Sequence, residues 1–292
     1  MNDRINEDLT EMKKKLCTYV DKGRAVGSSE VRQEPVFAVP LEKSRIKPLK
    51  KTDSCDFRVF AVDCSTRTLK RANNWGIYLL RSAHALVQGR NVQWGHEEGI
   101  CTVIGDAYAR FMSLRDARLE IESRMALRLL HGAERGDYLL LDGASYFGGM
   151  RKFQLFLYNE CEKKGIKLLT ISKQSPMLHD ERGRDFMAAA FILSPYPIWV
   201  YHPVATANLD EHLYGDISVA KFCSDSPRVF RCDIMKYLTE YGADELLSPL
   251  TYISEDPRCM GYPVTLWLAH DFSAPSDAKL LHYCEQVERI LE

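Results

Sequence analysis

The stretch "VFAVDCSTR", residues 59–67, is an apolar run that delivers an acid, Asp63. A second stretch, "YLLLDGASY" at 138–146, does the same with Asp142, and small residues follow each acid at once. Apolar runs of this length indicate strands, and a carboxylate on a buried strand is costly unless a cation or donor satisfies it. We therefore expect each strand to end at its aspartate, and each aspartate to have a partner.

The elements around these two runs define the fold class. Three strand-like segments separated by short polar turns come first and indicate an antiparallel meander. The order of three strands, helix, strand, helix, strand, helix is that of the ribonuclease-H-like fold, an α/β mixed sheet flanked by helices. The predicted strands are 57–65, 75–89, 99–106, 137–145 and 165–173, and the predicted helices are 108–132, 149–164 and 183–193.

The two ends of the chain add further elements. Residues 4–22 have helical spacing, and a polar linker with several basic residues follows. A solvated loop is the simpler interpretation of the basic run, and a phosphate-binding strip is the alternative. We divide the chain into an N-terminal helix and linker, 1–56, and one domain, 57–292. Additional C-terminal strands are expected at 198–204, 217–223 and 228–235, and a C-terminal helix at 276–291.

Composition limits the function classes. The 292 residues are 46% hydrophobic and 27% charged, with net charge −1, as is ordinary for a globular protein. No global basic field points to nucleic acid, so any DNA-binding surface must be local. The nine cysteines form no CxxC pair, which argues against a zinc ribbon, and they suit reduced thiols in a cytoplasm. The sequence contains no apolar run long enough to predict a membrane-spanning helix.

A third carboxylate is expected from the helix between the two acidic strands, which offers Glu120 and Glu122. At about 100° per residue, Glu122 falls inside the apolar arc of that helix, and Glu120 lies on the opposite side, nearer Arg124. Because a buried glutamate needs a cation or donor, we favour Glu122 as the ligand. Glu120 is then an i,i+4 partner of Arg124, and it remains the alternative ligand.

Three carboxylates at one sheet edge repel one another unless divalent ions join them. Oxygen ligands suit hard ions such as Mg²⁺ or Mn²⁺, and two ions roughly 3.5–4 Å apart promote phosphodiester hydrolysis. The small residues after each acid leave room for a phosphate backbone. Either aspartate alone is more often structural, because Asp-Gly is common turn chemistry. The two together, with a core-facing glutamate between them, indicate a metal site.

Five segments resemble, in order, the motifs of the NurA nuclease family. "FAVDCST", "RLEIESRMALRLL" and "YLLLDGAS" resemble the first three, and "LLTISKQS" resembles a further segment with a lysine after a strand. "GYPVTLWLAHDFS" resembles the final motif, with Tyr262 and His270 eight residues apart. The resemblance extends from about Phe57 to the C-terminus. One departure is Cys64, which stands where the family usually has glycine; cysteine is also small, so we expect the turn to survive.

The resemblance implies a Mn²⁺- or Mg²⁺-dependent deoxyribonuclease. Carried over by position, Asp63, Glu122 and Asp142 would bind the metal, His270 would complete the catalytic site, and Tyr262 would lie near it. The resemblance also implies 5′-to-3′ exonuclease and single-strand endonuclease activity on single-stranded DNA or duplex ends. It further implies a homodimer that works with a HerA-type hexameric helicase/translocase ATPase in DNA end processing.

Three further residues are candidates for substrate binding. Lys173 ends an apolar strand. One interpretation is that it contacts a substrate phosphate or offsets the acids; the alternative is a snorkelling lysine at a strand end. Tyr146 and Phe147 lie in a glycine-flanked loop just after Asp142. Exposure there would let them stack on unpaired bases.

Two other classes of protein share parts of this pattern. A catalytically inactive nuclease-fold adaptor for a translocase would have lost acids, and here all of them are present. An actin/hexokinase-like ATP-binding protein has the same sheet order. It needs a second domain with its own phosphate turn, and the sequence after residue 195 shows none.

Overall fold

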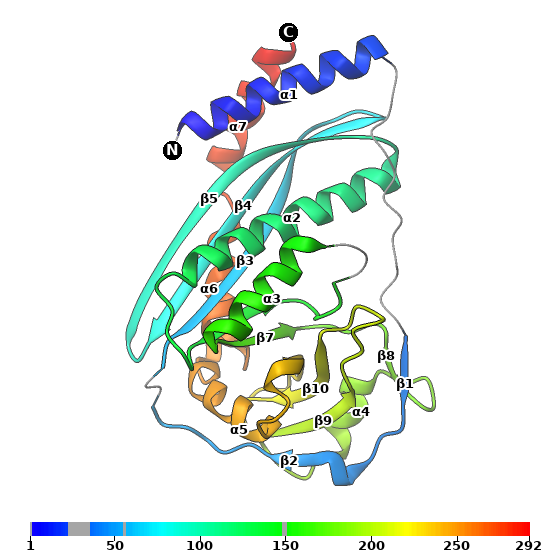
Figure 1. Ribbon diagram of the computed structural model, residues 1–292, viewed down its shortest axis with the longest axis vertical. Coiled ribbons are helices and arrows are strands. Elements are labelled where there is room, and N and C mark those ends of the chain that lie inside the picture. Colours follow the sequence, from blue (N-terminus) through cyan, green and yellow to red (C-terminus); the bar gives the residue numbers. More distant parts are fainter. Residues whose placement is uncertain (1, 23–35, 55–56, 148–150) are drawn as a thin grey trace.

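The computed structural model describes residues 2–22, 36–54, 57–147 and 151–292. Figure 1 shows an elongated molecule: long strands and the two terminal helices extend to one end, and the shorter strands and helices gather at the other. Among the helices in these ranges, none combines the length and hydrophobicity that a bilayer span requires.

Within the described residues, nine strands form the main sheet, in the order β2-β9-β10-β11-β7-β6-β3-β4-β5. Strands β3, β4 and β5 form the predicted antiparallel meander, and β6 and β7 pair in parallel at its side. The sheet therefore has the mixed α/β, ribonuclease-H-like character that the element order predicted. Its strands are β2 (Ile46–Pro48), β3 (Val59–Arg71), β4 (Trp75–Gln88), β5 (Asn91–Ile104), β6 (Tyr138–Asp142), β7 (Lys167–Ser172), β9 (Trp199–Ala205), β10 (Gly215–Lys221) and β11 (Phe230–Met235).

The pairing of β3 with β6 brings the two aspartates together. Val62 lies opposite Leu141 in the parallel register, so Asp63 and Asp142 each follow the last paired residue. Asp142 ends β6 as expected, but the expectation that Asp63 ends its strand is wrong. Beyond Asp63, β3 continues to Arg71 because β4 pairs with it over that whole length.

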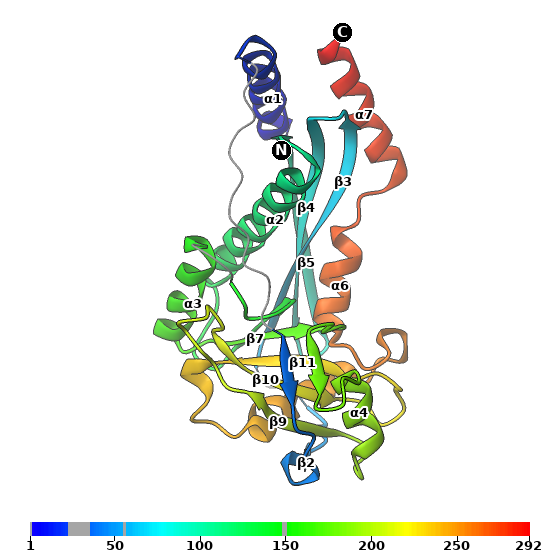
Figure 2. The same ribbon diagram turned by 90° about the vertical axis from the view of Figure 1, so that its right-hand side faces the viewer.

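Helices cover both faces of the long strands. In Figure 2, α2 (Ala107–Leu129) and α3 (Lys152–Lys164) lie on one side of β3–β5 and α6 (Val264–Ser273) lies on the other. The side chain of Asp106 caps α2 by accepting a hydrogen bond from the Ala109 amide at 2.8 Å, as N-caps do. Gly165 ends α3 with φ 68°, a left-handed conformation that glycine adopts without a Cβ penalty.

The remaining elements are short. The basic run predicted as a solvated loop is more ordered than that, because it forms a 3-10 turn, η1 (Lys43–Arg45), and the edge strand β2 on β9. Lys51 pairs with Glu255 at 2.6 Å. Strands β1 (Phe37–Val39) and β8 (Leu178–Asp180) form a separate two-stranded sheet. The other short elements are helical: α4 (Phe186–Leu193), η2 (Lys236–Leu238), α5 (Ala243–Leu247), η3 (Ser248–Ser254) and η4 (Pro257–Cys259).

The first helix, α1 (Asn2–Lys22), packs on the meander beside the last, α7 (Asp277–Leu291). Its apolar stripe includes the buried Leu9 and Met12, which share a cluster with Ile100 of β5 and Val287 of α7. The Asp8 carboxylate accepts a hydrogen bond from the Ile100 amide at 2.8 Å. These contacts place α1 on the domain, and the division at residue 56 stays a prediction.

Candidate active site

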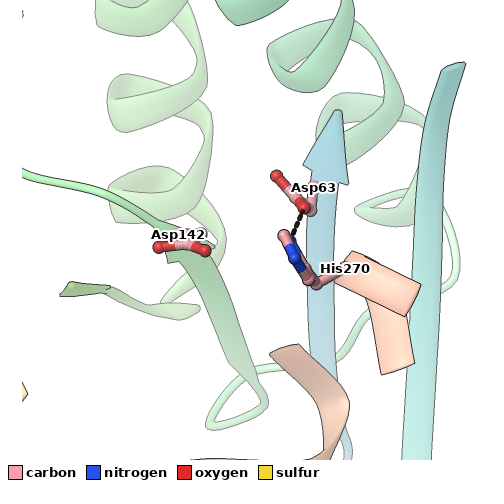
Figure 3. Close-up of side chains that lie close together, drawn as sticks. All are labelled: Asp63, Asp142 and His270. Atoms are coloured by element: carbon pink, nitrogen blue, oxygen red, sulfur yellow. Dashed lines mark hydrogen bonds and ion pairs between the residues drawn. The ribbon is translucent and has the colours of Figure 1, made fainter. Parts of the chain in front are cut away.

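Three side chains from distant parts of the chain meet at the fork between β3 and β6. Asp63 comes from β3, Asp142 from the end of β6 and His270 from α6, and Figure 3 shows them facing a common space. One ligand atom from each lies within 4.8 Å of the others. The sequence-predicted aspartates and histidine are therefore neighbours in space.

His270 and Asp63 are directly bonded. The His270 Nδ1 lies 2.8 Å from Asp63 Oδ2 (Figure 3), so Nε2 is the ring nitrogen left for another partner. The Cys64 amide donates to the other Asp63 oxygen at 2.8 Å. The Ser65 hydroxyl donates to the carbonyl of Ser273, and this contact joins β3 to the last turn of α6. Ser65 thus links β3 to α6.

The contact between His270 and Asp63 shifts the pKa values of both side chains. Burial works to raise the pKa of Asp63, but the hydrogen bond and the charge of His270 oppose it, and the pKa is lowered overall. The same hydrogen bond raises the pKa of His270 above its usual value, although burial opposes it. The pair is consequently stabilised as an aspartate with a protonated imidazole when no metal is present.

Glu122 lies beside this cluster on the inner face of α2. The residue is only 6% exposed, and its Oε1 atom has no hydrogen-bond partner among the described residues. Burial raises its pKa to about 8, and Asp63 and Asp142 push it the same way. Arg118 is the nearest cation, at 3.5 Å from Oε1. Glu120, by contrast, is outside and bonds Arg124, as the helical arc predicted.

Asp142 is held from its other side by Lys173, which follows β7. The Lys173 Nζ lies 3.5 Å from Asp142 Oδ2 and 4.5 Å from the ring centroid of Tyr262. Burial raises the pKa of Asp142, and Lys173 opposes that rise. Tyr262 is fully buried, and its hydroxyl donates to the Ile171 carbonyl at 3.4 Å. Lys173 and Tyr262 therefore adjoin the cluster from the β7 side.

The expected exposure of Tyr146 and Phe147 is wrong. They are 7% and 6% exposed, and Phe147 stacks on Tyr214 with 4.4 Å between ring centroids. The loop is drawn inward because the Ser145 amide donates to the buried Asp233 at 2.8 Å. The Phe147 amide also donates to the His212 carbonyl at 3.0 Å. Both aromatic residues form part of a cavity wall without offering a free face to solvent.

That cavity, of about 520 Å³, opens next to the carboxylates, and its cationic lining was not predicted. Arg118 and Arg115 lie one and two turns before Glu122 on the same helix face, and Arg151 lines the cavity with them. The spacing of the two α2 arginines from Glu122 was the available signal. The lining residues used below are Phe111, Arg115, Arg118, Glu122, Asp142, Arg151, Gln154 and Thr170.

The residues present fit a divalent cation. Two carboxylates and an imidazole converge, and a third carboxylate beside them leaves a buried oxygen without a hydrogen bond. Carboxylates suit Mg²⁺ and Mn²⁺, whereas an imidazole favours a transition ion. The donor set therefore accommodates Mn²⁺ at least as well as Mg²⁺.

Solved structures of NurA proteins share this architecture. The NurA nuclease from Sulfolobus solfataricus aligns with TM-score 0.62 and 15% identity over 97% of this chain and 96% of that chain. The chain has a NurA-like fold. A second NurA structure aligns with TM-score 0.55 and 9% identity, covering 80% of this chain and 88% of that one. No protein-family model and no curated protein matches the sequence.

A third NurA structure was solved with dAMP and manganese bound. It aligns with TM-score 0.53 and 10% identity, covering 81% of this chain and 88% of that chain. At identities this low, the structural alignments establish a shared fold and nothing more. This NurA-like fold is the one that the sequence motifs indicated. The chemistry of this chain has to be argued from its own residues.

Proposed function

We propose that the protein is a metal-dependent DNA nuclease that hydrolyses phosphodiester bonds. The observation that carries the proposal is the convergence of Asp63, Asp142 and His270, with ligand atoms within 4.8 Å of one another. The NurA-like fold supports it, since the NurA nuclease of Sulfolobus solfataricus shares it over nearly the whole chain.

Asp63, Asp142, Glu122 and His270 are the residues that would hold the ions, Mn²⁺ or Mg²⁺ and two in number. The bound metal would supply Lewis-acid stabilisation of phosphate charge and a nucleophile at neutral pH. A protein with manganese and dAMP bound is among the structures of the same fold, which supports a nucleotide and a divalent ion at this site.

The protein groups have separate tasks. Asp63 orients the His270 ring through Nδ1, which leaves Nε2 to bind metal or to move a proton at the reacting phosphate. Lys173 balances the charge of Asp142 and is placed to meet a phosphate oxygen as a point charge. Tyr262 packs under Lys173 and supports its position without itself reaching solvent.

The finer activity follows the NurA resemblance. We propose 5′-to-3′ exonuclease and single-strand endonuclease activity on single strands or duplex ends. We also propose a homodimer that acts with a HerA-type ATPase hexamer in DNA end processing. Mass determination in solution and co-purification with such an ATPase test the two assemblies separately.

The decisive experiment is cleavage of labelled single-stranded DNA with Mn²⁺. Asp142→Asn preserves shape but weakens the ligand, so cleavage should fall by roughly 100-fold or more. Asp210→Asn, at an exposed loop carboxylate that belongs neither to the cluster nor to the cavity lining, is the matched control and should cut normally. Normal cutting by Asp142→Asn overturns the site. An inert wild-type protein favours the adaptor, and ATP hydrolysis by the isolated chain favours the actin/hexokinase-like alternative.

A further inference from the structure

The cavity beside the carboxylates has a composition that the metal site does not explain. Its volume, about 520 Å³, lies in the range of small-ligand pockets. One wall contains Glu122 and Asp142, so anything bound in the cavity is adjacent to the proposed metal ions.

Helix α2 presents a single stripe to this cavity. Phe111, Arg115, Arg118 and Glu122 are spaced four, three and four residues apart, which places them on one helix face. At 1.5 Å per residue, the stripe leads away from Glu122 over roughly 16 Å. It ends at Phe111, whose side chain is 63% exposed at the cavity.

The cavity also concentrates positive charge. Arg151 faces the stripe from the start of α3 and pairs with Asp116 at 3.0 Å. Burial and the charge of Arg115 lower the pKa of Arg151, although Asp116 opposes them. Arg115 itself, in the part of the chain that the structure describes, has no acid within ion-pair distance. Two guanidinium groups that repel each other favour an anion between them, and guanidinium groups match phosphate oxygens in geometry.

Buried polar atoms at the same wall point to a ligand as well. The Thr170 hydroxyl and the Gln154 amide oxygen lack hydrogen-bond partners within the described ranges, and both residues line the cavity. Buried polar groups without partners are rare and call for an explanation. A polar ligand in the cavity would supply the missing bonds.

We propose that this cavity is the subsite for the nucleotide next to the cleaved phosphodiester, with a strand phosphate on Arg115, Arg118 and Arg151 and a base against Phe111. The proposal rests on the nuclease function proposed above and extends it to the substrate path. A nucleic-acid strand leaving the metal site then follows α2.

The test measures binding of a 3′-labelled single-stranded oligonucleotide by fluorescence anisotropy, with Ca²⁺ in place of Mn²⁺. Arg115→Gln should raise the dissociation constant roughly tenfold and reduce the salt slope by about 0.7 for one lost phosphate contact. Arg124→Gln removes the same charge from the same helix but on its outer face, and it should change neither quantity.

A second pair of variants tests the contact between the base and Phe111. Phe111→Ala should weaken binding roughly fivefold or more, whereas Tyr108→Ala, an aromatic residue that is 58% exposed on the same helix but outside the cavity, should not. In a series of oligonucleotides with an abasic nucleotide at successive positions, the wild type should lose affinity at one position. Phe111→Ala should lose no further affinity when the base is missing at that position.

Comparison of oligonucleotides with and without a 5′-phosphate identifies which phosphate the arginines hold. Loss of the Arg115 effect without the 5′-phosphate assigns the terminal group, and persistence assigns an internal one. If Arg115→Gln and Phe111→Ala bind like their controls, the subsite is overturned, even where Asp142→Asn has abolished cleavage. Normal cleavage by Asp142→Asn would instead overturn the nuclease site itself.

Discussion

At the scale of single residues, Glu122 is a buried carboxyl whose pKa is strongly shifted. Burial raises its pKa to about 8, and two neighbouring aspartates add to the rise. Its folded pKa is above its unfolded value, so the stability it contributes is present below about pH 4.5 and is lost as pH rises to about 8. Without metal, the protein should therefore lose stability over that window.

The isosteric change Glu122→Gln tests this account. In EDTA at about pH 8.5, the variant should be more stable than wild type by on the order of 2 kcal/mol, because the buried charge is gone. Near pH 4.5 the difference should be small. Urea unfolding at both pH values measures it, and a variant that is less stable at the higher pH would contradict the burial argument.

His270 should separate function from stability. Its side chain is 61% exposed, but that of its partner Asp63 is only 9% exposed, so His270→Ala should cost about 1–3 kcal/mol of unfolding free energy for the buried carboxylate that loses a hydrogen bond. Cleavage should nevertheless fall by roughly 100-fold, because the orienting Asp63 then holds no imidazole. His282→Ala, a histidine on α7, is the control for both measurements. Equal activities would exclude His270 from the site.

At the scale of elements, α1 is held on the meander by a narrow apolar stripe. Met12 is 1% exposed there, and Met12→Ala should cost about 2–4 kcal/mol of the docking energy. The Ile100 amide, which donates to Asp8, should then lose protection from hydrogen exchange while the amides of β6 and β7 keep theirs. Uniform loss across the sheet would instead show that α1 is inseparable from the core.

The sequence predicted most elements because their apolar periods are regular. It predicted the neighbourhood of Asp63 and Asp142 from strand order, and the inner placement of Glu122 from helical phase. It missed the burial of Tyr146 and Phe147, because the loop is drawn in by Asp233, which is distant in sequence. The continuation of β3 past Asp63 was also missed, since it depends on pairing with β4.

At the scale of the whole molecule, metal binding should be visible as added stability. A ligand that binds only the folded state at 100 times its dissociation constant adds about 2.7 kcal/mol. Mn²⁺ should therefore raise the melting temperature of the wild type, and Asp63→Asn combined with Asp142→Asn should abolish the rise. Asp210→Asn should keep it. An equal rise in all three proteins would indicate nonspecific ion binding.

The fork at Asp63 has a further consequence for how the site meets its ions. One edge of β3 is paired with β4 along the length of the strand, whereas the opposite edge is paired with β6 only as far as Val62. The gap between the two aspartates is thus set by backbone hydrogen bonds, before any cation arrives. A site preorganised in this way needs little rearrangement of the backbone, so ion binding should move the ligating atoms little.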